Sequence, residues 1–354
     1  MIVVIADDIT GAAELAGMAC SCGLHTEMLT KMAPRLPSCD VLVMATDTRS
    51  MTEGDAVACT IAIARQLAGY GCRLFKKTDS ALRGHIMAEI QALLSVTDYG
   101  SAVFIPANPS KNRIIRQRVY YVDGVPIDET DFSRDPEFPA FSSLMTERFP
   151  AASEMGVVIP DVESMEDIRA AIDDVPEDTL LVGAADLFSV WLQGMGHVRQ
   201  DAFKPARVGG SNIILVCGST QSKAVRPDIP TSSMPLEVYD DVAPLSLWKE
   251  QAVALYEERH AIALNIPHRH LTGREVAVRL RGMMAEVVKT LVERHLPANL
   301  VIEGGATAYC CLKSLGWDTF HVIGEMSPGV VSMEATNGTV ITLKPGSYDW
   351  GLFM

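Results

Sequence analysis

Residues 74–85 hold the densest group of side chains able to do chemistry, in the order Leu-Phe-Lys-Lys-Thr-Asp-Ser-Ala-Leu-Arg-Gly-His. A short apolar strand is predicted at the start of this stretch, and apolar residues at helical spacing predict a helix from Ile86. Open α/β sheets bind ligands at such junctions, outside the carboxyl ends of their strands. Lys77 and Arg83 suit an anionic ligand, and Asp79 can accept a proton or a hydrogen bond from a hydroxyl group.

The same stretch also has a purely structural interpretation. Asp79 or Ser80 would make a good N-cap for the following helix, with solvated charges around it. Taken alone, the stretch does not decide between a capped turn and a binding site.

The beginning of the chain has a similar junction. Residues 2–6 are all apolar and predict a buried parallel strand, which ends at Asp7 and Asp8. Two adjacent carboxylates are costly to hold together unless they face a cation, hydroxyl groups or water. Thr10 and Gly11 can cap the next helix and let the backbone approach a ligand closely. A capped turn is again the alternative, but two such junctions in one domain favour a shared pocket.

Two further polar groups belong to the first half of the chain. Arg49 lies in a polar cluster, residues 46–50, that follows a predicted strand at residues 41–45. Asn112 and Arg113 lie in a loop rich in hydrogen-bond donors that follows another predicted strand. We expect these groups to recognise hydroxyl and carboxylate groups of a ligand.

The second half contains turns suited to phosphate. Gly304 and Gly305 separate a predicted buried strand from a helix, so backbone N–H groups are exposed at the positive end of that helix, and Thr307 adds a hydroxyl group. Residues 218–219 form a similar turn with Ser219, and residues 344–346 add Lys344 and Gly346. A lone pair of glycines is weak evidence, because glycine also simply permits a tight turn.

Length and composition limit the classes of protein. With 354 residues, two domains are the natural expectation, and a net charge of −14 argues against nucleic acid as a partner. No apolar run is long enough for a membrane span. The eight cysteines, without a signal peptide, predict a reduced, cytoplasmic protein, and their spacing is not that of a zinc site. Neither GxGxxG nor a Walker A motif occurs.

The predicted fold class is α/β. We expect two domains, each built on a mainly parallel sheet flanked by helices, with the active-site cleft between them. The predicted boundaries are residues 1–208 for the domain expected to recognise hydroxyl and carboxylate groups and residues 209–354 for the domain expected to bind phosphate. The sequence leaves open whether the protein forms a homodimer.

Several motifs, in order along nearly the whole chain, resemble those of the four-carbon acid sugar kinases. They are Ala-Asp-Asp-Ile-Thr-Gly at 6–11, Lys-Thr-Asp-Ser-Ala-Leu-Arg-Gly at 77–84, the segment 106–126, Gly-Gly-Ala-Thr at 304–307, Pro-Gly at 328–329 and Leu-Lys-Pro-Gly at 343–346. The resemblance implies phosphorylation by ATP, with Mg²⁺, of a hydroxyl on threonate, erythronate or a 3-oxo-tetronate. Ala306 stands where family members commonly carry an acidic residue.

The resemblance and the residue types together give a set of candidate site residues. The candidate catalytic residues are Asp79, Asp8 and Lys77, with Asp79 preferred as the base because nearby cations keep it ionised. The candidate substrate-binding residues are Asp7, Asp8, Arg49, Lys77, Asp79, Ser80, Arg83, Asn112 and Arg113. The candidate nucleotide-binding residues are Ser219, Gly304, Gly305, Ala306, Thr307, Gly329, Lys344 and Gly346. The metal ligands are not predicted.

Two other functions stay open at this point. A lyase acting on similar hydroxy acids needs only carboxylates and a cation, whereas the missing GxGxxG motif argues against a dehydrogenase. A sensor that binds a sugar acid and a nucleotide without turnover is also compatible with Ala306.

Overall fold

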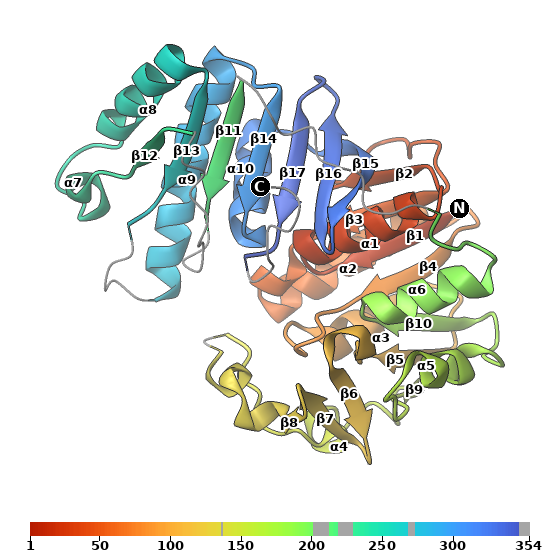
Figure 1. The fold of residues 1–354 in the computed structure, drawn as a ribbon. Coiled ribbons are helices and arrows are strands. Elements are labelled where there is room, and N and C mark those ends of the chain that lie inside the picture. Colours follow the sequence, from red (N-terminus) through yellow and green to blue (C-terminus); the bar gives the residue numbers. More distant parts are fainter. Residues whose placement is uncertain (136, 201–211, 219–228, 268–272, 347–354) are drawn as a thin grey trace.

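The structure, a computed structural model, describes residues 1–135, 137–200, 212–218, 229–267 and 273–346. Two α/β halves lie side by side, one formed by residues 1–200 and the other by residues 212–346 (Figure 1). The predicted domain boundary, between residues 208 and 209, falls outside the described residues. Within the described part, no helix combines the length and the apolar character needed to cross a membrane.

The first half contains a large sheet, a small sheet and helices on both sides of the large one. The strands of the large sheet are β1 (Ile2–Ala6), β2 (Thr26–Leu29), β3 (Val41–Ala45), β4 (Arg73–Lys77), β5 (Ser101–Ile105), β9 (Val157–Val158) and β10 (Thr179–Gly183). The small sheet has β6 (Arg113–Arg116), β7 (Val119–Val122) and β8 (Val125–Pro126). The helices are α1 (Ile9–Ser21), α2 (Glu53–Leu67), α3 (Ile86–Val96), α4 (Met145–Arg148), α5 (Met165–Ile172) and α6 (Ala185–Gly194), with 3-10 turns η1 (Thr48–Ser50), η2 (Pro109–Lys111), η3 (Ile127–Glu129) and η4 (Asp131–Arg134).

The second half has the same α/β character. Its strands are β11 (Ile213–Cys217), β12 (Thr231–Ser233), β13 (Ala261–Asn265), β14 (Asn299–Glu303), β15 (Thr319–Ser327), β16 (Val330–Ala335) and β17 (Val340–Lys344). Its helices are α7 (Leu236–Tyr239), α8 (Ser246–Arg259), α9 (Arg274–Arg294) and α10 (Gly305–Leu315).

The parallel strands of the first half end in register. Ala6 lies beside Ala45 and Lys77, and Gly183 lies beside Lys77 and Ile105. Strands β3 and β4 flank β1 on opposite sides, so the chain crosses over β1 between them. Polar residues that follow β1, β3 and β4 therefore emerge together at a point where ligands commonly bind.

The α/β class with mainly parallel sheets is confirmed, but the sheets of the two halves are joined edge to edge. The fourteen-stranded sheet of the described residues runs in the order β12-β13-β11-β14-β17-β16-β15-β2-β3-β1-β4-β10-β5-β9. The junction is an antiparallel pairing of Thr319, Phe320 and His321 on β15 with β2. This junction was not predicted from the sequence, because β2 and the β15–β16 hairpin were not recognised there.

Helix α1 packs against both halves, which explains its small residues. Gly11, Ala12, Ala16 and Ala19 are buried, and α1 contacts β15 and β16 as well as β1 and β3. A Cβ atom on Gly17 would lie 2.7 Å from the side chain of Val331, so a larger residue would separate α1 from the hairpin. Figure 1 shows α1 at the contact between the halves.

Candidate active site

A small polar cleft lies where the first-half strands end. Its volume is about 120 Å³, below the ~300–1,000 Å³ of pockets for drug-sized ligands. It is lined by Asp8, Thr10, Gly11, Glu14, Arg49, Lys77, Asp79, Ser80, Arg83, Asn108, Lys111, Arg113, Ala184 and Ala185, and by Pro345 from the second half. Five cationic side chains face three carboxylates there, so the cleft suits an anion although the whole chain is acidic.

Arg49 is the centre of the charge network in this cleft. Its Nε lies 2.8 Å from Asp7 Oδ2, its Nη2 lies 3.1 Å from Asp8 Oδ1, and the same nitrogen is 4.0 Å from Asp79 Oδ1. Burial would lower the pKa of Arg49, but the three carboxylates outweigh it and hold that pKa well above its ordinary value. One cation therefore holds together carboxylates that would otherwise repel one another.

Asp7 lies behind Arg49 and does not line the cleft. It is only 1% exposed, and burial raises its pKa despite the neighbouring Arg49. Its Oδ1 has no hydrogen-bond partner among the described residues. The geometry thus differs from the expected contact with substrate: Asp7 orients Arg49, because the alternation of the chain after β1 turns only Asp8 toward the cleft.

Asp8 combines capping with a position in the cleft. It is the N-cap of α1, where its side chain accepts a hydrogen bond from the Gly11 N–H, and Thr10 Oγ1 donates to its other oxygen at 2.5 Å. The cap is therefore Asp8 itself, and not Thr10 or Gly11 as expected. Burial would raise the pKa of Asp8, but Arg49 and Lys77 overcome it and hold that pKa below its ordinary value.

Asp79 is not a helix cap, so the structural interpretation of this residue is wrong. Helix α3 begins at Ile86, and its N-cap position is occupied by His85, without a side-chain capping bond. Asp79 instead accepts two hydrogen bonds from Arg83, at 2.5 and 3.3 Å. Burial would raise the pKa of Asp79, but Arg49 and Arg83 outweigh it and leave the carboxylate ionised far below neutral pH.

The adjacent lysines of β4 have different surroundings, since successive side chains of a strand point to opposite faces. Lys76 is fully buried, and its Nζ lies 2.9 Å from Glu89 Oε1, which also accepts from Thr48. Lys77 lines the cleft at 4% exposure, and its Nζ donates to the Thr78 carbonyl at 2.8 Å. Within the described part of the chain, no carboxylate oxygen lies within 4.0 Å of that ammonium. Lys77 is therefore a buried cation facing the space for a ligand.

The loop after β5 contributes to the cleft through other residues than expected. Arg113 lines the cleft and donates to Ser80 Oγ, whereas Asn112 is exposed, has a left-handed backbone (φ 53°) and does not line it. Asn108 and Lys111 line the cleft instead, and Lys111 pairs with Glu14. The signal for Lys111 was its place in the same donor-rich loop, but Glu14 looked like an ordinary helix residue.

The Gly-Gly turn of the second half meets the first half at this cleft. Helix α10 begins at Gly305, its N-cap is Gly304, and no side chain caps it. A Cβ atom on Gly305 would lie 2.7 Å from Thr10 Cγ2, so the first turns of α10 and α1 are in direct contact. Similarly, a Cβ atom on Gly218 would lie 2.3 Å from Thr307 Oγ1. Free N–H groups at the start of α10 therefore point to an anion site beside the cleft.

Two family models match this chain, one in each half. The model of a sugar-binding N-terminal domain matches residues 2–179, and the model of a nucleotide-binding C-terminal domain matches residues 237–348. The chain belongs to the four-carbon acid sugar kinase family.

Individual relatives cover nearly the whole chain. A D-threonate kinase of Salmonella typhimurium is 26% identical over 97% of this chain and 94% of its own length. A 3-oxo-tetronate kinase of Burkholderia multivorans is 25% identical over 97% of this chain and 93% of its own. The crystal structure of a Haemophilus influenzae protein of the DUF1537 family has the same fold, with a TM-score of 0.72 at 20% identity over 99% of this chain and 98% of the other.

The other candidate residues of this family member lie in different surroundings. Lys344 is 1% exposed, and its ammonium lies 2.8 Å from the carboxylate of Glu303, the residue directly before the Gly-Gly turn. Gly329 lies in the β15–β16 turn, where its N–H donates to Glu325. This turn lies at the same end of the sheet as Gly304, because the start of β16 is beside the end of β17, which is beside the end of β14. The remaining candidates are Ala306, which is exposed, Gly346, which follows β17, and Ser219, which falls outside the described residues.

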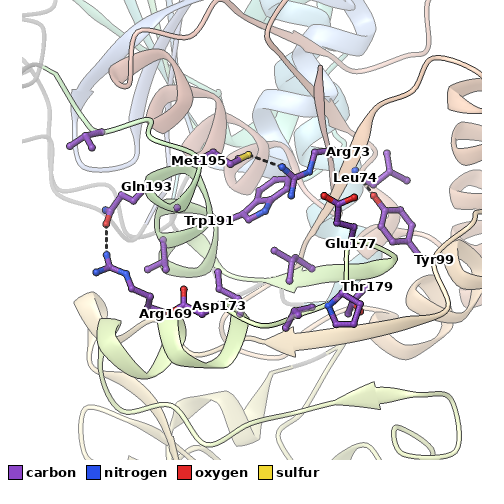
Figure 2. Close-up of a pocket in the computed structure, with 17 residues that line it drawn as sticks. Arg73, Leu74, Tyr99, Arg169, Asp173, Glu177, Thr179, Trp191, Gln193 and Met195 are labelled. Carbon is purple, nitrogen blue, oxygen red and sulfur yellow. Dashed lines mark hydrogen bonds between the residues drawn. The ribbon is translucent and has the colours of Figure 1, made fainter.

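A larger pocket of about 730 Å³ lies at the other end of the first-half strands from the cleft (Figure 2). Arg73 begins β4 and Thr179 begins β10, so the pocket is at the amino ends of these strands. Its main feature is the indole of Trp191, with the Arg73 guanidinium 5.1 Å from the ring centroid. Size alone therefore does not identify the site, because open α/β sheets bind ligands at the carboxyl ends of their strands, where the charged cleft lies.

Proposed function

We propose that this protein transfers the γ-phosphoryl group of ATP to a hydroxyl of a four-carbon sugar acid such as threonate, erythronate or a 3-oxo-tetronate. Two observations support the proposal: relatives that match nearly the whole chain are named as kinases of D-threonate or 3-oxo-tetronate, and a cationic cleft adjoins an uncapped helix. The first half would hold the sugar acid and the second half the nucleotide.

The observation that carries the proposal is the buried ammonium of Lys77. A buried charge without an ion-pair partner is strongly unfavourable, so it is retained where a ligand supplies the opposite charge. Lys77 lines the cleft together with Asp8 and Asp79, where it would contact a substrate carboxylate or a phosphoryl group held at α10. A sensor would use the same cation for binding alone, and turnover separates these cases.

The roles of the other residues follow from their positions. Arg83 and Arg113 would pair with the substrate carboxylate, and Arg49 would hold Asp8 and Asp79 against the substrate hydroxyls. Asp79 would accept the proton of the attacking hydroxyl, since its carboxylate is ionised and is not needed as a helix cap. Because phosphoryl transfer is loose, that proton leaves late, and a weakly basic carboxylate suffices.

The nucleotide phosphates would lie against the first N–H groups of α10. A divalent cation such as Mg²⁺ usually needs only one or two carboxylates besides the phosphates. Ala306 offers no ligand, but Glu303 directly precedes the turn, and its Oε2 accepts no hydrogen bond from the described residues. Glu303 would hold the ion, which when bound neutralises charge on the phosphates.

The proposal is tested by incubating the protein with Mg-ATP and each of the candidate acids in turn. We expect ADP to form only when a four-carbon acid is present, and mass spectrometry to find that acid heavier by one phosphoryl group. Binding of both ligands without ADP would support a sensor instead. Loss of the acid without ATP would support a lyase.

A further inference from the structure

A cluster of two histidines and one glutamate lies on the seam between the halves, away from the cleft. His321 Nδ1 lies 3.0 Å from Glu27 Oε1, and His25 Nε2 lies 3.3 Å from the same oxygen. The two imidazole centroids are 5.3 Å apart. Among the described residues, no other group of three or more histidine, cysteine or carboxylate side chains is spaced to hold a metal ion.

We propose that His25, Glu27 and His321 bind a divalent transition-metal ion, with Zn²⁺ as the expected occupant. Two imidazoles and one carboxylate are a common ligand set for Zn²⁺. Bonds of ~2.0–2.1 Å at tetrahedral angles place neighbouring ligand atoms about 3.3 Å apart. The two measured separations from the Glu27 oxygen agree with this value, and all three ligand atoms lie within 4.8 Å of one another.

The backbone holds these ligands in position without the metal. Glu27 on β2 and His321 on β15 are direct partners across the antiparallel pair. His25 is two residues before Glu27, so both side chains leave the same face of the strand. The His25 N–H donates to Asp40 Oδ2 and its carbonyl accepts from the Asp40 N–H, each at 2.9 Å. The backbone at these positions is therefore already ordered before an ion binds.

The position of the cluster suggests what the ion would do. His25 and Glu27 belong to the first half, and His321 belongs to the second. The β2–β15 pairing that joins the sheets is only three residue pairs long. A metal bound by ligands from both strands would fasten this short junction and hold the halves in one relative orientation.

The experiment uses the full-length protein after removal of metals with a chelator. Calorimetric titration with ZnCl₂ should show one site in the wild type. His321→Gln should weaken that affinity by at least about 100-fold, because losing a ligand costs more than the 10–100-fold of an outer partner. His295→Gln is the matched control, since His295 is partly exposed and lies 3.0 Å from a glutamate, Glu257, but belongs to no group of three possible metal ligands among the described residues. It should bind Zn²⁺ like the wild type.

Two further measurements keep the test decisive. Zn²⁺ should raise the melting temperature of the wild type and of His295→Gln but not of His321→Gln, and all three should melt alike in chelator. Bound Co²⁺ should give the visible absorption of a tetrahedral site in the same two proteins only. Equal Zn²⁺ affinity in wild type and His321→Gln, or no Zn²⁺ binding by the wild type, would overturn the proposal.

Discussion

The two adjacent lysines of β4 allow a sharp comparison. Both side chains are almost completely buried, but Lys76 pairs with Glu89, whereas Lys77 faces the cleft with only a carbonyl contact described for its ammonium. We predict that Lys76→Met damages stability and that Lys77→Met damages catalysis. Methionine is chosen because it keeps an unbranched, apolar side chain of nearly the same length and removes the ammonium group.

The expected magnitudes follow from what each charge contacts. Lys76→Met leaves the Glu89 carboxylate buried and uncompensated, and breaking a buried pair in this way costs about 3–5 kcal/mol of unfolding free energy. Lys77→Met strands no carboxylate within ion-pair distance, so its unfolding free energy should fall by less than about 1 kcal/mol, or rise. Removing one cation aimed at transition-state charge should lower kcat by about 10²–10³-fold.

The assay measures ADP formation with a saturating sugar acid, together with urea unfolding followed by circular dichroism. Lys77→Met should be folded and nearly inactive, and Lys76→Met should unfold at lower urea while its folded fraction retains turnover. If Lys77→Met loses stability as much as Lys76→Met, the ammonium has a structural role. If it keeps wild-type kcat and KM, Lys77 does not contact the reacting groups.

Three other substitutions test separate parts of the site. Asp79→Asn should lower kcat by about 10²–10⁴-fold with little change in ATP affinity. Asp8→Asn keeps a good helix cap and should lower kcat less. The reverse order of steady-state rates would identify Asp8 as the base. Gly305→Ala should place its Cβ against the Thr10 methyl group and lower turnover. Thr10→Ser removes that methyl group but keeps the hydroxyl bound to Asp8, so turnover should be restored in the double variant. If turnover is not restored, contact with the Thr10 methyl group does not cause the loss. Burial raises the pKa of Asp47 to about 6, so ionisation of this carboxyl group destabilises the folded state as the pH rises from about 4 to about 6. Asp47→Asn should therefore stabilise the protein by roughly 2–3 kcal/mol near pH 8 and not near pH 4. Equal shifts of the melting temperature at both pH values would contradict this.

Most of the charged residues that line the cleft could be predicted from the sequence. Because parallel strands end at one edge, the polar residues after β1, β3 and β4 had to emerge together once those strands were recognised. Asp8, Arg49, Lys77, Asp79, Ser80 and Arg83 were predicted in this way, whereas Glu14, Asn108, Lys111 and Pro345 were not. The predicted roles in catalysis and binding remain predictions.

Side-chain direction and long-range pairing could not be obtained from the sequence. Whether Asp7 or Asp8 faces the cleft depends on the path of the chain at the end of β1, and both are carboxylates in the same motif. The β2–β15 pairing joins residues nearly 300 positions apart, and β2 has only four residues, so no local pattern marks it. The histidine and glutamate cluster was missed for the same reason.

Each half contains a buried strand followed by a helix start, but the two helices have different N-caps. This difference matches the proposed ligands. In each half a buried strand ends at a helix start, and Thr10 and Gly305 bring the two helix starts into contact. Helix α1 has a carboxylate cap in Asp8, which offsets the positive end of the helix and presents acceptor oxygens to hydroxyl groups. Helix α10 has only Gly304 at its cap, so its N–H groups and positive end are left for phosphate. Under the proposed function, the phosphoryl donor and the hydroxyl acceptor would therefore meet where the two helix starts are in contact, with Lys77 lining the same cleft.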